Sequence, residues 1–492
     1  MKPLRFAAVA VPVALAAQVA TFTVWATAAF ALAPTPVQNL LLAGRNPADL
    51  RARLLAHADS VRTNGIDAGE AWYHAGLSWA RGGSGDSALV VFERARAVRG
   101  NVEETVAAVD VLLARGAGPD LDSATALLAP VLQQPGAGGD EVMLRDAWIR
   151  ARRGDSAALV TVADLRRSPL FRPLSLVANR ALWAWRFAPL ALAAGAGEAA
   201  WRMVSPLAVA TRGRDAGIAG LARSASVGRS LGTGFDSWLT SACARADTVE
   251  LATIRRLGGK PLAVKAEDGA VLNAWYVPGP PGAAIAVVTA PAGSEQAAAC
   301  DSLVTQLRRA RLAVALLEPR GVRRSASATE PPALLRTGRE EADQRRLARD
   351  LRHALTAAGR AAGVAAPRSV MVGVGPDVMA AVLASAADAR VQAVVLAGPE
   401  IAPGDRGWLR ETLAVSGVPA FFETGPDNIT QNLEIDRIVA ALPPAQCRVA
   451  DSRSRGHGAA LFRAGPEEGA RLAGWISGTL KKPRATPPAP PR

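Results

Sequence analysis

The sequence is poor in the residues that usually build metal, redox and disulfide sites. Its 492 residues include three cysteines and four histidines, and aromatic residues make up 5%. Cys243, Cys300 and Cys447 are far apart and form no C-x-x-C pair, which argues against a disulfide framework or a zinc site. We therefore expect no metal and no cofactor.

Positive charge is abundant, but it is not arranged as in a nucleic-acid-binding surface. The formal net charge is +14, and the arginines are spread along the chain, usually close to Asp or Glu. The scarce aromatic residues are not interleaved with basic runs, as they are in single-strand binders. We expect no nucleic-acid partner.

A long uncharged segment stands near the N-terminus. Lys2 and Arg5 precede the run from Phe6 to Ala33, which contains no charged residue. Such a run is long enough to cross a bilayer, and it could be an uncleaved anchor or a secretory signal. The positive residues favour the cytoplasmic side. Residues 1–33 thus predict an envelope protein, anchored in the inner membrane or exported to the periplasm.

Residues 34–46 are an expected linker, and helical periodicity dominates residues 47–246. The triplet Asp-Ser-Ala recurs there at 86–88, 122–124 and 155–157, at intervals of 36 and 33 residues. Such a period is typical of helix-pair repeats. We expect Asp and Ser in each triplet to be helix N-caps.

The first repeat carries a pattern of large, small and aromatic residues. Its positions are Trp72, Ala75, Gly76 and Trp79 on one helix, then Ala88, Phe92 and Ala95 on the next. This pattern resembles the tetratricopeptide repeat (TPR), although Val106 and Leu128 replace the large aromatic residues in the second unit. The resemblance covers about residues 47–170 and implies an all-α solenoid. The alternative is an ordinary antiparallel helical array.

A TPR-like solenoid implies a protein or peptide partner bound on its concave face. On the first helix this face should include Glu70, Tyr73 and Leu77, while Trp72 and Trp79 turn inward. Residues 171–230 are predicted to be helices that cap the repeats and pack on the next domain.

Residues 247–480 alternate between strands and helices. This alternation predicts an α/β domain with three layers, in which helices cover both faces of a mostly parallel sheet. The expected strands begin near residues 262, 271, 283, 312, 369, 391, 418 and 447. The basic, Pro-rich tail at 481–492 is expected to be disordered.

Residues 369–381 are the most informative stretch, because they predict a buried strand, a sharp turn and a helix of small residues. Gly373 and Gly375 hold the first and nucleophile positions of the pattern G-x-S-x-G. Together with a Glu-Asp-Gly hairpin turn at 267–269 and Glu-Pro-Arg-Gly at 318–321, the segment resembles the α/β-hydrolase superfamily. The dienelactone-hydrolase and acyl-peptidase-like branches are the most similar.

The resemblance implies a serine nucleophile, a histidine base and an acid that orients the histidine. His457 and Asp427 match the family's histidine and acid positions, and Asn428 is an alternative for the acid. The nucleophile position is Gly375, which has no hydroxyl. The oxyanion segment also departs from the family pattern, since it reads Ala-Pro-Ala-Gly at 290–293.

Three functions follow from these patterns. The first is an envelope scaffold whose hydrolase-like domain is catalytically degenerate, with Gly373, Gly375 and Pro376 left as a binding turn. The alternative is an active hydrolase of ester or peptide-like substrates with a non-standard nucleophile. The third is a dinucleotide-binding protein, because Gly373 and Gly375 open a helix and Glu400 ends the next strand.

Overall fold

The computed structural model describes most of the chain. The described residues are 35–61, 64–133, 139–159, 177–213, 215–227, 232–234, 236–241, 251–290, 294–322, 325, 341–365, 367–426, 429–453, 458–463 and 466–482. The predicted membrane segment lies outside these ranges. Within them, no helix combines the length and the apolar character needed to span a bilayer.

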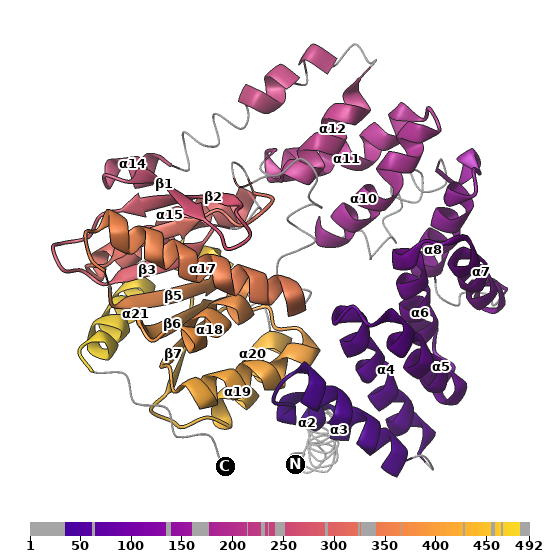
Figure 1. Ribbon diagram of the computed structural model, residues 1–492, viewed down its shortest axis with the longest axis horizontal. Coiled ribbons are helices and arrows are strands. Elements are labelled where there is room, and N and C mark those ends of the chain that lie inside the picture. The colour runs from indigo at the N-terminus through magenta and orange to yellow at the C-terminus, as the bar shows by residue number, and fades with distance from the viewer. Residues whose placement is uncertain are drawn as a thin grey trace, which may run out of the picture.

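The first half of the described chain is helical and forms an arc beside the α/β domain (Figure 1). Its helices are α2 (Pro36–Ala43), α3 (Pro47–Ser60), α4 (Gly65–Arg81), α5 (Gly85–Arg99), α6 (Val102–Arg115), α7 (Gly118–Leu132), α8 (Gly139–Arg152), α10 (Val177–Ala193), α11 (Gly197–Thr211) and α12 (Ala216–Ser226). Successive helices pack against each other, as expected for an array of helix pairs.

The first pair, α4 and α5, packs as its small residues predict. Phe92 is buried, and a β-carbon on Gly76 would stand only 2.5 Å from Cε1 of the Phe92 ring. Glycine at position 76 therefore allows the two helices to approach closely. The pairing agrees with a helical-repeat array, while the TPR identity stays a prediction.

The Asp-Ser-Ala triplets do not all act as helix caps. Only Asp155 accepts a backbone hydrogen bond at a helix start, from the amide of Ala157 at 3.0 Å. Asp86 instead forms an ion pair with Arg115 at the end of α6, and Asp122 forms one with Arg153 just after α8. The N-cap prediction is wrong for these two triplets, because the Asp side chain links one unit to the next.

The expected linker at 34–46 contains a helix. Thr35 and Gln38 form a reciprocal capping box that begins α2. Val37 and Leu41 of this helix are fully or almost fully buried. Residues 36–43 are therefore part of the folded core and not a spacer.

In the described part of the α/β domain, eight strands form one sheet in the order β1-β2-β4-β3-β5-β6-β7-β8. The strands are β1 (Lys260–Lys265), β2 (Val271–Val277), β3 (Ile285–Thr289), β4 (Ala313–Leu317), β5 (Ser369–Val374), β6 (Val391–Ala397), β7 (Ala420–Thr424) and β8 (Cys447–Asp451). β2 pairs antiparallel with both of its neighbours, β1 and β4. Every other pairing, from β4 to β8 in that order, is parallel. The sheet is therefore mostly parallel, as the sequence predicts.

Helices cover both faces of the sheet and complete three layers. One apolar core joins the sheet to α17 (Glu341–Ala361), α18 (Val378–Ala387), α19 (Arg406–Ser416) and α20 (Ile429–Ala440). A second core joins it to α14 (Ala252–Arg256), α15 (Ser294–Arg309), α21 (Pro466–Leu480) and the short turn η5 (Gly458–Arg463).

The helical arc meets the α/β domain near both of its ends. At one end, α2 packs on α19, and Arg81 of α4 pairs with Asp405 at 2.8 Å. At the other end, Asp215 forms an isolated bridge with Val322, in the loop that follows β4. Both contacted loops follow parallel strands at their carboxyl ends, so the arc lies on the side of the sheet where the elbow is found.

Candidate functional site

The turn after β5 has the backbone of an elbow. All six residues of β5 are buried, and the chain then passes through the turn η3 (Gly375–Asp377) into α18. Gly375 has φ +59°, in the left-handed region that favours glycine. A β-carbon on Gly373 would stand 2.7 Å from Cα of Val378. The two glycines are therefore required by the tight strand–turn–helix geometry itself.

The Glu400 side chain lies over the apex of the elbow. The backbone N–H of Glu400 donates a hydrogen bond to the carbonyl oxygen of Gly375 at 3.0 Å. Its Oε1 lies 3.4 Å from the position that a β-carbon on Gly375 would take. Glu400 follows β6 and is exposed, so an accessible carboxylate stands where a nucleophilic side chain would begin.

The elbow itself carries a buried carboxyl group, two residues after Gly375. Asp377 is the last residue of η3 and is 1% exposed, and the Thr289 hydroxyl lies within hydrogen-bonding reach of its carboxyl group. Burial raises the pKa of Asp377 to about 7, and the negative charge of Glu400 also raises it. A hydrogen bond from the nearby Thr289 hydroxyl, at the end of β3, lowers the pKa of Asp377. Asp377 can therefore exchange a proton near neutral pH.

A further buried acid ends β7. Glu423 is completely buried, and its Oε1 accepts from Nη2 of Arg471 on α21 at 3.2 Å. Burial raises the pKa of Glu423 to about 8, although the positive charge of Arg471 lowers it. The carboxyl ends of β5 and β7 thus both carry acids that are partly neutral near pH 7.

The predicted triad residues are not placed. His457, Asp427 and the alternative Asn428 lie outside the described residues. The chain on either side of them is anchored: the amide of Ser452 donates to the Thr424 carbonyl at 2.8 Å. The hydroxyl of Ser452 donates to the Leu461 carbonyl at 2.9 Å. Convergence of His457 and Asp427 on Gly375 stays a prediction.

The described part of the oxyanion segment offers little hydrogen-bonding capacity. The Ala290 amide donates to the Leu317 carbonyl at 2.7 Å, as part of the sheet. It is therefore committed to the backbone. The carbonyl oxygen of Pro376, the next residue of the elbow, accepts from Nε2 of Gln344 at 3.4 Å.

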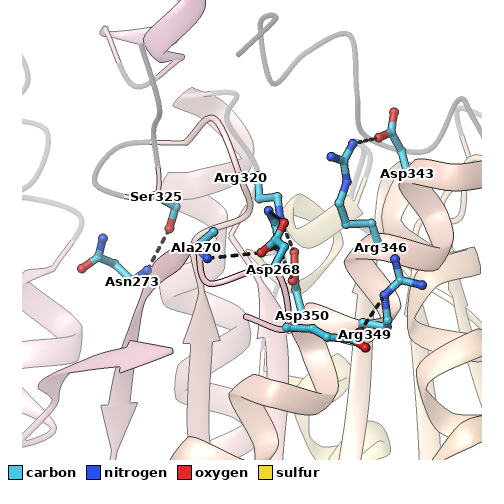
Figure 2. A network of polar contacts seen from close by, with 10 residues as sticks. Asp268, Ala270, Asn273, Arg320, Ser325, Asp343, Arg346, Arg349 and Asp350 are labelled. Atoms are coloured by element: carbon cyan, nitrogen blue, oxygen red, sulfur yellow. Dashed lines mark hydrogen bonds and ion pairs between the residues drawn. The ribbon is translucent and has the colours of Figure 1, made fainter. Parts of the chain in front are cut away.

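The Glu-Pro-Arg-Gly segment is structural. Figure 2 shows Arg320 between two carboxylates, Asp268 in the β1–β2 turn and Asp350 on α17. The hydrogen bonds from Arg320 lower the pKa of Asp268 to about 2. Ser325, in the same loop, accepts from the Asn273 amide at 2.8 Å. These contacts hold the loop after β4 against the edge hairpin and α17.

The predicted binding residues of the first repeat are only partly accessible. Glu70, Tyr73 and Leu77 are all half-buried, while Trp72 is buried at 7% exposure. The Tyr73 ring lies 6.1 Å from the Phe92 ring of α5, and burial raises the pKa of Tyr73. Trp72 is buried as expected, whereas Trp79 is only half-buried. Peptide binding on this face stays a prediction.

Comparison with known proteins gives distant structural likenesses. No family model matches the chain, and no curated protein matches it in sequence. An esterase from Pyrococcus furiosus is 13% identical with a TM-score of 0.35, over 47% of this chain and 94% of the esterase. The dienelactone hydrolase from Anabaena variabilis is 18% identical with a TM-score of 0.33, over 45% of this chain and 96% of that one.

A peptidase structure is matched over a smaller part of its own length. Dipeptidyl peptidase 4 from Porphyromonas gingivalis is 14% identical with a TM-score of 0.32, over 45% of this chain and 35% of the peptidase. At these values the likenesses carry no argument about the fold or the activity of this chain. The description of the fold depends on the strand order and on the strand, turn and helix at β5, η3 and α18.

Sequence reasoning missed part of this site. From its sequence position, Asp377 follows Pro376 at the start of a predicted helix and is expected to serve helix-start chemistry, but its side chain forms no cap hydrogen bond. Sequence reasoning did not single out Thr289 or Glu423. The available signal was positional, because each of these polar residues stands at or just after the carboxyl end of a strand in an otherwise apolar run.

Proposed function

We propose that the chain is an envelope scaffold protein whose α/β-hydrolase-like domain does not act as a serine hydrolase. The observation that supports this most directly is Gly375 at the apex of the elbow. The backbone keeps the left-handed turn of a nucleophile elbow, but no hydroxyl or thiol projects from it. Loss of a triad nucleophile lowers the rate of hydrolysis by about a million-fold.

The test is reaction of the full chain with a serine-directed fluorophosphonate and with an activated ester. We expect no covalent label and no hydrolysis above that of a heat-denatured sample. Hydrolysis that is lost in a His457→Ala variant would overturn the proposal. A His353→Ala variant is the matched control, since that histidine lies on α17, away from the elbow.

The second candidate is a working hydrolase of ester or peptide-like substrates. It is favoured by the acids at the elbow, because Asp377 has a pKa of about 7 and Glu400 stands at the apex. A group that titrates near the working pH suits general acid–base catalysis. If this candidate is correct, the unmodified chain hydrolyses the ester, and hydrolysis is lost in His457→Ala and in Glu400→Gln. The dinucleotide hypothesis loses its main support, since packing against α18 accounts for Gly373.

The proposed location follows from the uncharged run in residues 1–33. We propose that this segment targets the chain to the inner membrane and leaves residues 47–480 on its outer side. Cell fractionation of the native full-length chain tests this. Recovery of the full-length chain in the cytoplasmic fraction would contradict it.

The proposed partner is an extended peptide or protein segment bound by the helical repeats. Tyr73 is half-buried between α4 and α5 and retains exposed surface. Tyr73→Ala should weaken capture of an immobilised partner without changing the far-ultraviolet circular dichroism. Unchanged capture would exclude this face as the binding surface.

A further inference from the structure

A groove lies at the edge of the sheet opposite the elbow. Its volume is about 550 Å³. It is formed where β6, β7 and β8 begin and where α21 passes beneath them. The lining residues include Gln392, Pro419, Gln446, Trp475, Gly478 and Lys482.

The α21 side of the groove is flat because two glycines lie one turn apart. For Gly474 and Gly478, no described atom lies within 4 Å of the position of an added β-carbon. Glycine in a helix interior costs about 1 kcal/mol relative to alanine, and local packing does not account for either residue. Trp475 stands between them in sequence, half-buried, with its ring centre 5.2 Å from that of Phe421. The groove therefore has an open floor beside an aromatic side chain.

One polar atom in the groove wall lacks a partner. Oε1 of Gln392 is buried, and no hydrogen bond to it is found within the described part of the chain. The neighbouring Gln446, in contrast, donates to the carbonyls of Leu413 and Val418 at 2.6 and 3.2 Å. A buried acceptor of this kind is usually matched by a donor. Gln392 therefore contributes a buried, unmatched acceptor to the residues that line the groove.

We propose that residues 483–492 of the same chain dock in this groove as a polyproline II segment. Lys482, the residue that directly precedes them, is itself part of the lining. Five of the ten residues are proline: 483, 487, 488, 490 and 491. Such a segment is extended at about 3.1 Å per residue, so ten residues reach about 31 Å.

The chemistry of the groove matches that occupant. Proline-rich segments bind aromatic-lined grooves, and their preformed helix loses little conformational entropy on binding. Proline has no N–H group to leave unpaired. Unlike proline, Arg484, Ala485 and Thr486 each carry a backbone N–H group, the kind of donor that Gln392 lacks. Attachment through Lys482 also gives the tail a high effective concentration at the groove.

Limited trypsin digestion of the full chain tests the proposal. Trypsin cuts after Arg484, which is followed by Ala485, and intact mass spectrometry detects the loss of residues 485–492. In a Gly478→Leu variant the leucine side chain occupies the groove, because no described atom lies within 4 Å of its β-carbon position. We expect Arg484 to be cut at least tenfold faster in Gly478→Leu than in the wild type. Gly220→Leu on α12 is the matched control, since its added β-carbon would also meet no described atom within 4 Å.

Each result has a defined meaning. Equal cleavage rates in wild type and Gly478→Leu would overturn the proposal. Protection that disappears on dilution would show that the tail of a second copy fills the groove, and would also overturn it. If Gly478→Leu does not fold, Gly474→Leu replaces it, because it fills the same floor one turn away. This experiment does not depend on the proposed function, because it measures no activity and no partner.

Discussion

The Glu400 carboxylate lies 3.4 Å from the point where a β-carbon on Gly375 would stand. In a serine hydrolase that region must hold a nucleophile and stabilise developing negative charge. A carboxylate about 4 Å from an oxyanion opposes it by on the order of 4 kcal/mol at an effective dielectric constant of 20. The site is therefore unsuited to serine chemistry in its charge as well as in its missing side chain.

This relationship predicts how a restored serine will behave. Gly375→Ser should fold but lose about 1–2 kcal/mol of stability, because a side chain is strained in the left-handed region. We expect Gly375→Ser/Glu400→Gln to react with a fluorophosphonate at least tenfold faster than Gly375→Ser, since the second change removes the opposing charge. Labelling rates by mass spectrometry measure this. Gly375→Ala/Glu400→Gln is the unlabelled control, and equal rates in the two serine variants would contradict the electrostatic argument.

Asp377→Asn should stabilise the protein at high pH and not at low pH. The pKa of Asp377 is raised to about 7 in the folded chain, against 3.8 for the ordinary group. Between these values the folded state binds more protons than the unfolded state, so stability falls as pH rises. Near pH 8 the buried charge costs on the order of a few kcal/mol, and the amide removes that cost.

Denaturant unfolding of wild type and Asp377→Asn at pH 5 and pH 8 measures this effect. The advantage of Asn over Asp should be larger at pH 8 than at pH 5, because the folded-state carboxyl ionises between these two values. Glu423 also titrates with a raised pKa, but it is present in both proteins and cancels from the comparison. A difference that does not change with pH would show that Asp377 carries no charge penalty.

The sheet could be predicted from sequence because its strands are short apolar runs, each bounded by turn residues. Ser369–Val374 is entirely buried, and the turn at Gly375 follows directly from the local pattern. Contacts between distant segments could not be predicted this way. Asp86 and Asp122 pair with arginines about 30 residues further along the chain, and nothing local distinguishes such a pair from an N-cap.

Helix α2 was not predicted either, and the reason is again a contact between distant segments. Its local signal was present, since Thr35 and Gln38 have the spacing of a capping box. Eight residues alone are too short to predict a stable helix. Its stability comes from packing on α19, more than 360 residues away in sequence. The acid–base chemistry of the elbow could not be predicted from the sequence either, because the raised pKa of Asp377 depends on burial by several elements.

Gly76→Ala should destabilise the helical half, although alanine is the better helix former. The gain in helix propensity is about 1 kcal/mol. The added carbon, however, would stand 2.5 Å from the Phe92 ring, and overpacking of this kind costs about 1–3 kcal/mol. We expect Phe92→Leu to recover part of the loss in the double variant. Thermal unfolding of the four proteins gives the coupling energy. Strictly additive effects would show that the two residues do not meet.

The last prediction concerns the contact between α2 and α19. A β-carbon on Gly407 would stand 2.1 Å from the Gly44 carbonyl oxygen, which is backbone and cannot rotate away. Gly407→Ala should therefore push α2 off the α/β domain, and the amides of α2 should exchange with deuterium at least tenfold faster. Gly220→Ala, where the added carbon has space, should leave that exchange unchanged.

The Arg81–Asp405 ion pair holds the same surfaces together, with the Asp405 side chain only 5% exposed. Because both contacts maintain one interface, Asp405→Asn should cost less stability in the Gly407→Ala background than in the wild type. Full additivity, or unchanged exchange in α2, would show that the helical arc is held to the sheet elsewhere.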